Sequence, residues 1–240
     1  MRRSDSRTED RPAEPANSAR ADGAGEAMNP SLIVAVASSA GDLEAVCELL
    51  STLPAECAAA FIIVQHVDSG RERLLYETLA KRTSLPVMRA HDGAIVEQGH
   101  VYVITANTTL TIASGRIRMT PNPTGLYPGD ILFTSLAKDH GPGAIGVVLS
   151  GEGSDGALGI QAIKRAGGAA FVQYPGSARF PSMPISAIQT GCVDFVLHPN
   201  EIAHELAHRS RYTAPPALSY PVPALVAARP PAHPQPLARH

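Results

Sequence analysis

The feature that most constrains the fold is a repeated alternation of short apolar segments with longer segments of helical periodicity. Residues 31–37 (SLIVAVA) and 61–65 (FIIVQ) are typical of strands, and each is followed by apolar side chains at helical spacing. Strands that are apolar on both faces favour a parallel sheet between two layers of helices. The pattern predicts further strands at 101–105, 144–149, 169–173 and 193–197, and helices at 43–50, 71–82, 130–139, 157–166, 184–190 and 200–211.

One further segment alternates with the period of an exposed strand. Residues 108–114 and 117–119 flank Ser114-Gly115, which predicts an antiparallel hairpin. We therefore predict an α/β, doubly wound fold with a mostly parallel sheet, the hairpin at one edge and helices on both faces. Residues 30–212 are long enough to form this fold as one domain with a single buried core.

The two ends of the chain differ from this core in composition. Residues 1–29 mix arginines with acidic residues and hold almost no large apolar side chain, and residues 213–240 hold eight of the 21 prolines. Neither end can bury enough apolar surface to offset the entropy of ordering it. We expect two disordered, dispensable tails, and the first of them lacks the apolar region of a secretory signal peptide.

Composition excludes several classes of function. The formal charge of −2 gives no sign of a nucleic-acid-binding protein, and no apolar run reaches the ~20 residues that cross a bilayer. Three cysteines, Cys47, Cys57 and Cys192, cannot all pair with one another. The simpler interpretation is a reduced, cytoplasmic protein without direct membrane insertion.

Polar residues follow three of the predicted strands. Ser39 follows the first strand, His66 follows the second, and Asp155 lies in the loop after the strand at 144–149. Such loops meet at the carboxyl edge of a parallel sheet, where ligands bind. A serine, a histidine and an aspartate can serve as nucleophile, general base and base-orienting carboxylate.

The context of the serine adds to this hypothesis. Residues 37–41 (ASSAG) match the nucleophile elbow G-x-S-x-G around Ser39, except that alanine replaces the first glycine. Small neighbours permit a tight turn whose backbone amides can hold an oxyanion. Taken alone, Ser38 or Ser39 is more often the N-cap of the next helix, and His66 or Asp155 alone is more often structural. Their joint placement at strand ends is what favours a hydrolytic site.

Five segments carry a resemblance to one family. In order along the chain they resemble the catalytic domain of CheB-type chemotaxis methylesterases, and the resemblance spans about residues 32–206. These segments are residues 33–45 (IVAVASSAGDLEA), 64–86 (VQHVDSGRERLLYETLAKRTSLP), 99–104 (GHVYVI), 146–159 (GVVLSGEGSDGALG) and 183–191 (MPISAIQTG).

The resemblance implies an activity and a set of roles. The family hydrolyses glutamate methyl esters on methyl-accepting chemoreceptors, and some members deamidate receptor glutamines. Carried over residue by residue, its nucleophile falls on Ser39, its base on His66 and its acid on Asp155, with oxyanion-binding main chain near Ala40 and Glu152. We expect no cofactor and no bound metal. The partners that the resemblance implies are a chemoreceptor or a similar methylated protein, and a receptor methyltransferase or a separate response regulator.

The chain departs from the family at several positions. The family usually has glycine where Ala37 and Asp42 stand, an aspartate at Tyr174 and an arginine at Ile185. These departures keep open an alternative, in which the chain is a catalytically weakened or inactive module that pairs with a methyltransferase or receptor. Family members commonly carry an N-terminal phosphoreceiver domain. Because residues 1–29 stand in its place, we expect no control by phosphorylation within the chain.

Two other motifs in the chain have simpler explanations. Gly151-x-Gly153-x-x-Gly156 has the spacing of a dinucleotide-binding loop, but the next strand, 169–173, ends without the acid that would hold a ribose. His204-Glu205-x-x-His208 matches a zinc-protease motif. The apolar residues between and before its histidines instead predict an amphipathic terminal helix with both imidazoles outward.

Overall fold

The computed structural model describes residues 30–39, 43–65, 72–104, 108–122 and 127–211. Every predicted strand and helix is present, and no end shifts by more than two residues. A short strand at Val87–Arg89 and two 3₁₀ turns escape the sequence pattern because they are too short to show a period. The strands are β1 (Ile33–Ser38), β2 (Ala60–Gln65), β3 (Val87–Arg89), β4 (Val101–Val103), β5 (Thr108–Ala113), β6 (Arg116–Pro121), β7 (Ala144–Val148), β8 (Ala169–Gln173) and β9 (Phe195–Leu197). The helices are α1 (Leu43–Thr52), α2 (Glu72–Ala80), α3 (Pro128–His140), α4 (Ala157–Arg165), α5 (Ser182–Gln189) and α6 (Pro199–Arg211), with 3₁₀ turns at Gly141–Gly143 and Pro175–Ser177.

The main sheet is parallel and confirms the predicted fold class. Its order is β3-β4-β2-β1-β7-β8-β9, and every pairing within it is parallel. The chain moves outward from β1 in one direction through β2 and β4, and in the other through β7 and β8. The loops that follow β1 and β7 therefore diverge, and this switch point is where open α/β sheets form their ligand-binding crevice.

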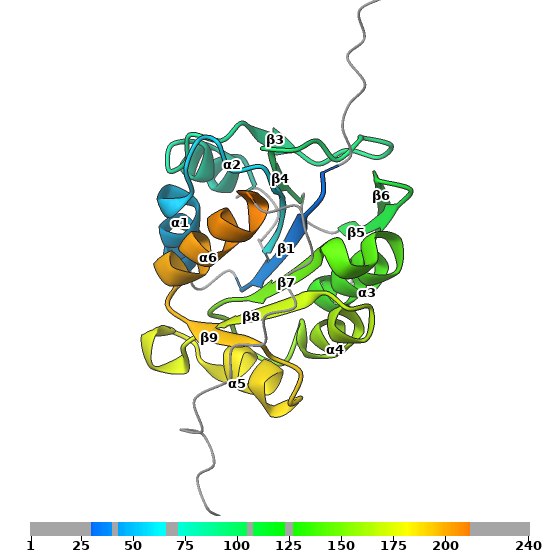
Figure 1. The fold of residues 1–240 in the computed structure, drawn as a ribbon. Coiled ribbons are helices and arrows are strands. Elements are labelled where there is room, and N and C mark those ends of the chain that lie inside the picture. Colours follow the sequence, from blue (N-terminus) through cyan, green and yellow to red (C-terminus); the bar gives the residue numbers. More distant parts are fainter. Residues whose placement is uncertain (1–29, 40–42, 66–71, 105–107, 123–126, 212–240) are drawn as a thin grey trace, which may run out of the picture.

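Two layers of helices cover the sheet, as Figure 1 shows. Helices α1, α2 and α6 pack on one face, and α3, α4 and α5 on the other. Strand β1 supplies both cores, because its side chains alternate between the faces. Ile33, Ala35 and Ala37 face α3, whereas Val34 and Val36 face α1. Complete burial on both sides accounts for the continuous apolar runs in the sequence.

The position of the hairpin differs from the prediction. Strands β5 and β6 form a separate two-stranded sheet and do not pair with the edge of the main sheet. The reason is that the hairpin packs against α3, where the amide of Ile112 donates to Ser135 Oγ at 3.0 Å. The turn residues Ser114 and Gly115 donate their amides to the Asp139 carboxylate. Helix α3 is thus held between the main sheet and the hairpin.

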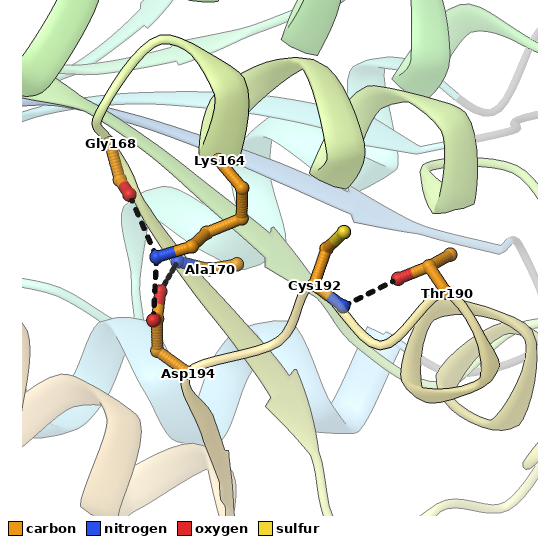
Figure 2. Close-up of polar contacts among 6 residues, drawn as sticks. All are labelled: Lys164, Gly168, Ala170, Thr190, Cys192 and Asp194. Atoms are coloured by element: carbon orange, nitrogen blue, oxygen red, sulfur yellow. Dashed lines mark hydrogen bonds and ion pairs between the residues drawn. The ribbon is translucent and has the colours of Figure 1, made fainter.

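An ion pair lies at the amino ends of the strands, at the opposite edge of the sheet from the strand carboxyl ends (Figure 2). Lys164 Nζ in the last turn of α4 lies 2.6 Å from Asp194 Oδ1, just before β9. The other carboxylate oxygen accepts the amide of Ala170 in β8 at 2.8 Å. These contacts join α4, β8 and β9 into one unit. In the described part of the chain, none of the helices is both long enough and apolar enough to cross a membrane.

Candidate functional site

Ser39 lies at the switch point of the sheet, directly after β1. Ser39 is half-buried, whereas the preceding Ser38, the last residue of the strand, is buried. The amide of Ser39 donates to the carbonyl of Ser150, beyond β7, at 3.2 Å. This contact fastens the start of the loop after β1 to the start of the loop after β7. The predicted nucleophile is therefore held by the strand that leads to Asp155.

Asp155 is buried, with 7% of its surface exposed, and both of its carboxylate oxygens are bound. Oδ2 accepts the amide of Gly129 and Oδ1 accepts the amide of Asp130, each at 2.9 Å. These two amides belong to the first turn of α3, where helical N–H groups lack partners within the helix. The positive end of the helix dipole favours a carboxylate at this place. Helix α3 thus fixes the orientation of Asp155.

The sequence of α3 permits this approach. Pro128 occupies its first turn, where the missing N–H costs nothing, and Gly129 follows. A Cβ at Gly129 would lie 2.9 Å from Ala37 Cβ and 3.0 Å from Asp155 Oδ2. Only glycine allows the backbone to come this close to the carboxylate.

The side chain of Asp130 in turn binds the start of the next helix, α4. Its Oδ1 accepts the amide of Gly159 in the first turn of α4 at 2.7 Å, and its side chain is buried. Burial raises the pKa of the Asp130 carboxyl, the Gly159 hydrogen bond partly opposes this, and the nearby charge of Asp155 raises the pKa further. The two helix starts are therefore bound reciprocally, since α3 amides hold Asp155 and an α3 side chain holds α4.

The loop after β7 packs directly against the serine. An added Cβ at Gly151 would collide with the Sδ of Met183 and would lie 2.9 Å from Ser39 Cβ and 3.0 Å from Ser39 N. The amide of Gly151 donates to Phe180 O at 2.9 Å, and its carbonyl accepts the amide of Met183 at 3.0 Å. Gly151 is therefore fixed from both sides and has no room for a side chain.

Replacing Gly151 with Ala should lower the catalytic rate about 100-fold, because a shift of about 1 Å in a reacting group has an effect of this size. Steady-state hydrolysis of an ester substrate measures the rate, and circular dichroism establishes that the variant is folded. Gly191→Ala is the matched control, since a Cβ there meets nothing within 4 Å and the strained backbone costs stability alone. Equal rates for Gly151→Ala and Gly191→Ala would contradict the assignment of Ser39 to a tightly packed reactive position.

Two predicted site positions, His66 and Ala40, and the departure at Asp42 lie outside the described residues. Glu152, the other predicted oxyanion position, is described, and its residue is exposed. Its neighbours Gly151 and Gly153 already donate their amides, to Phe180 O and to Ser182 Oγ. The Glu152 amide donates to none of the described residues, as an oxyanion donor must before substrate binds.

A groove of about 670 Å³ lies elsewhere, along α3 between the hairpin and α4. Its lining includes the apolar Ile131 and Leu158 and the charged Lys138 and Asp139. Neither Ser39 nor Asp155 lines this groove. The strand-end site is therefore distinct from it, although Asp130 borders both.

The zinc-protease motif lies on α6, and its histidines point outward as predicted. His204 and His208 are exposed, while Ile202, Ala203 and Leu206 face the core. Glu205 Oε1 accepts from Arg209 Nε at 2.9 Å. Within residues 30–211, leaving aside the undescribed gaps, no group of three His, Cys, Asp or Glu side chains is placed to hold a metal ion.

We expect hydrolysis to be independent of metal. Treatment with EDTA should leave the rate unchanged, and so should the double substitution His204→Ala with His208→Ala, because both imidazoles lie on the outer face of α6. The measurement is ester hydrolysis before and after dialysis against the chelator. A loss of rate that added zinc restores would contradict this expectation.

The departures from the family pattern that the structure describes lie near this edge of the sheet. Tyr174 directly follows β8, is half exposed and has its ring 5.6 Å from that of His198. Ile185 is exposed on α5, two residues beyond the buried Met183. An aromatic and an apolar side chain therefore face solvent at the two positions where the resemblance implies charged groups.

Sequence reasoning missed four residues of this site. Gly129 and Asp130 hold Asp155, and the buried Gln65 and Gln173 contact the loops after β1 and β7. The proline at position 128 signals a helix start, but its proximity to residue 155 depends on the tertiary fold. For the glutamines, the available signal is a polar residue that ends an otherwise apolar strand.

Several known proteins are similar to this chain. A family model described as CheB methylesterase matches residues 34–206. The chain is 37% identical over 180 residues to protein-glutamate methylesterase/protein-glutamine glutaminase 3 of Anaeromyxobacter dehalogenans, covering 73% of this chain and 53% of the relative. It is 38% identical over 164 residues to a Myxococcus xanthus protein of the same description, covering 68% and 46%. It thus spans about half the length of these curated relatives.

A solved structure matches over the same region. The crystal structure of the Thermotoga maritima CheB methylesterase catalytic domain superposes with a TM-score of 0.68 at 26% identity. The match covers 74% of this chain and 98% of the Thermotoga chain. Because the family model matches residues 34–206 and a solved catalytic domain of the same description shares the fold, the chain belongs to the CheB methylesterase family.

Proposed function

We propose that this chain is a protein-glutamate methylesterase that hydrolyses glutamate methyl esters on methyl-accepting chemoreceptors, with glutamine deamidation as a related reaction of the same site. The observation that carries the proposal is the contact between the Ser39 amide and the Ser150 carbonyl, which joins the two loops that bear Ser39 and Asp155. Membership of the CheB methylesterase family and the names of its relatives support the substrate class.

The reaction follows from the chemistry of a serine, a histidine and an aspartate. Ser39 Oγ attacks the ester carbonyl while His66 takes its proton, because an alcohol is a poor nucleophile at neutral pH. Asp155 orients the imidazole and stabilises the imidazolium. The backbone amides of Ala40 and Glu152 bind the oxyanion. The C–O bond to the methoxy group then breaks, and His66 returns the proton to give methanol.

Water completes the cycle. His66 removes a proton from a water molecule, whose oxygen attacks the acyl carbon, and the tetrahedral intermediate expels Ser39 Oγ, which regains its proton. The product is a free glutamate side chain. A glutamine side chain follows the same path with ammonia as the leaving group.

A methanol-release assay on a methylated chemoreceptor tests the proposal. Hydrolysis by the wild-type chain that is lost on substitution of Ser39 supports it. Binding to a receptor or a methyltransferase without any release of methanol would favour the alternative of a non-catalytic module. The observation that favours this alternative is the exposure of Tyr174 and Ile185.

The proposal includes the partners and the compartment. Beyond the receptor, a receptor methyltransferase supplies the esters that this reaction removes, and a separate response regulator is the proposed source of control. Such partners act in the cytoplasm, where three unpaired cysteines stay reduced.

A further inference from the structure

Two buried glutamines stand at the carboxyl edge of the sheet, on either side of the proposed nucleophile. Gln65 is the last residue of β2 and Gln173 is the last residue of β8, with 5% and 2% of their surfaces exposed. A buried carboxamide costs free energy unless its donors and acceptors are bound. The hydrogen bonds of these two carboxamides therefore indicate their role.

The contacts form one continuous chain of hydrogen bonds. Gln65 Nε2 donates to the carbonyl of Ser39 at 3.3 Å, and the Ser39 amide donates to the Ser150 carbonyl at 3.2 Å. The Ser150 amide donates to Gln173 Oε1 at 2.8 Å. Gln173 Nε2 then donates to the carbonyl and the hydroxyl of Ser177, at 3.2 and 3.3 Å. This amide relay crosses four adjacent strands, β2, β1, β7 and β8.

The backbone partners fix the role of each glutamine. A carbonyl only accepts, so Gln65 must present its NH₂ group to Ser39, and an amide N–H only donates, so Gln173 must present its oxygen to Ser150. The two side chains are therefore not equivalent. Gln65 donates to the Ser39 carbonyl, and Gln173 accepts from the Ser150 amide.

Gln65 is poorly explained as a stabilising residue. Its Oε1 is buried and has no hydrogen-bond partner in the described part of the chain, and the same holds for Oγ of Ser38 beside it in the strand register. An unpaired buried acceptor is destabilising, and an apolar side chain of similar length would avoid that cost. The contact of Gln65 with the Ser39 carbonyl is the contribution that remains.

We infer that Gln65 and Gln173 are positioning residues, which hold the backbone of Ser39 in its reactive place through the amide relay. Neither touches the reacting atoms in this assignment. The inference rests on the proposed role of Ser39 as nucleophile. It adds that residues at the ends of β2, next to β1, and of β8, next to β7, determine the position of Ser39.

Gln65→Met and Gln173→Met test the inference. Each should lower kcat for methyl-ester hydrolysis 10- to 100-fold with KM changed less than twofold, since the serine is misplaced while the substrate surface is kept. The melting temperature of Gln65→Met should be unchanged or higher. Ser177→Ala is the control, because Gln173 keeps the Ser177 carbonyl as a partner, and its kcat should stay within twofold of wild type.

Glutamate substitutions distinguish the two roles. Gln173→Glu keeps an acceptor for the Ser150 amide, so it should retain more activity than Gln173→Met. Gln65→Glu loses the donor to Ser39 and should retain no more activity than Gln65→Met. Because both glutamines act through the same Ser39–Ser150 contact, the double Met variant should lose less than the product of the two single losses.

Hydrogen exchange decides the inference independently of catalysis. The Ser39 amide, followed by NMR, should exchange at least tenfold faster in Gln65→Met and in Gln173→Met than in wild type. Unchanged exchange together with unchanged kcat in folded variants would overturn the inference, as would a fall in melting temperature without either change. If the wild-type chain releases no methanol, the proposed function fails, and the exchange rates still decide whether the relay holds Ser39.

Discussion

Ser39→Ala is expected to lower methanol release from a methylated receptor by about three orders of magnitude or more, because it removes the atom that attacks the ester. His66→Ala should cost about as much, since without a base the hydroxyl stays protonated. The double variant should be scarcely worse than either single one, because groups that act as a unit lose function non-additively. The measurement is kcat/KM for each variant.

Ser38→Ala is the matched control for this experiment. Ser38 is buried, and its Oγ has no partner among the described residues, so its loss should change the rate only slightly. The wild-type rate should rise as the pH increases through the range in which an imidazole loses its proton. Equal hydrolysis by Ser39→Ala and wild type would refute the assignment of the nucleophile.

Asp155→Asn is expected to lower the rate about 100- to 10,000-fold and also to destabilise the fold. Both carboxylate oxygens accept backbone amides, from Gly129 and Asp130. An asparagine must turn its NH₂ group toward one of these donors, which leaves a buried N–H unpaired at a cost of about 1–3 kcal/mol. It also loses the charge that stabilises the imidazolium. Methanol release and urea denaturation measure the two effects.

Asp139→Asn separates these effects. Asp139 also accepts two backbone amides, from Ser114 and Gly115 at the hairpin turn, but it lies at the other end of α3. Its substitution should lower the free energy of unfolding and leave the rate per folded molecule unchanged. If Asp155→Asn behaved in the same way, Asp155 would be a structural residue and the acid would have to be sought elsewhere.

Local sequence patterns were sufficient to predict the parallel sheet and most of its elements. Buried strands such as β1 and β2 are apolar on both faces, and this signal lies within six residues. The hairpin was also predicted, but its packing against α3 depends on the contact of Ile112 with Ser135, and no local pattern reports such a contact. Its expected place at the sheet edge was therefore wrong.

In the candidate site too, some features could be predicted from local sequence and others depend on tertiary contacts. The structure brings the loops of Ser39 and Asp155 to one switch point, as expected from their strand ends, while the roles of Ser39, His66 and Asp155 stay predictions. Gly129 was not found from sequence, because the need for a missing Cβ arises only when α3 meets a residue far along the chain. The same reason hid the partner of each buried glutamine.

The central position of β1 has a consequence for the protein during its synthesis. Among the strands of the main sheet, β1 is synthesised before the others, and β2 follows soon after to cover one of its edges. Its other edge pairs with β7, which begins only at Ala144. Until then the strand keeps a row of unpaired N–H and C=O groups, a template for association with other nascent chains. The late strand that removes this hazard also leads into the loop that bears Asp155, so pairing of this edge and completion of the proposed site depend on the same segment of the chain.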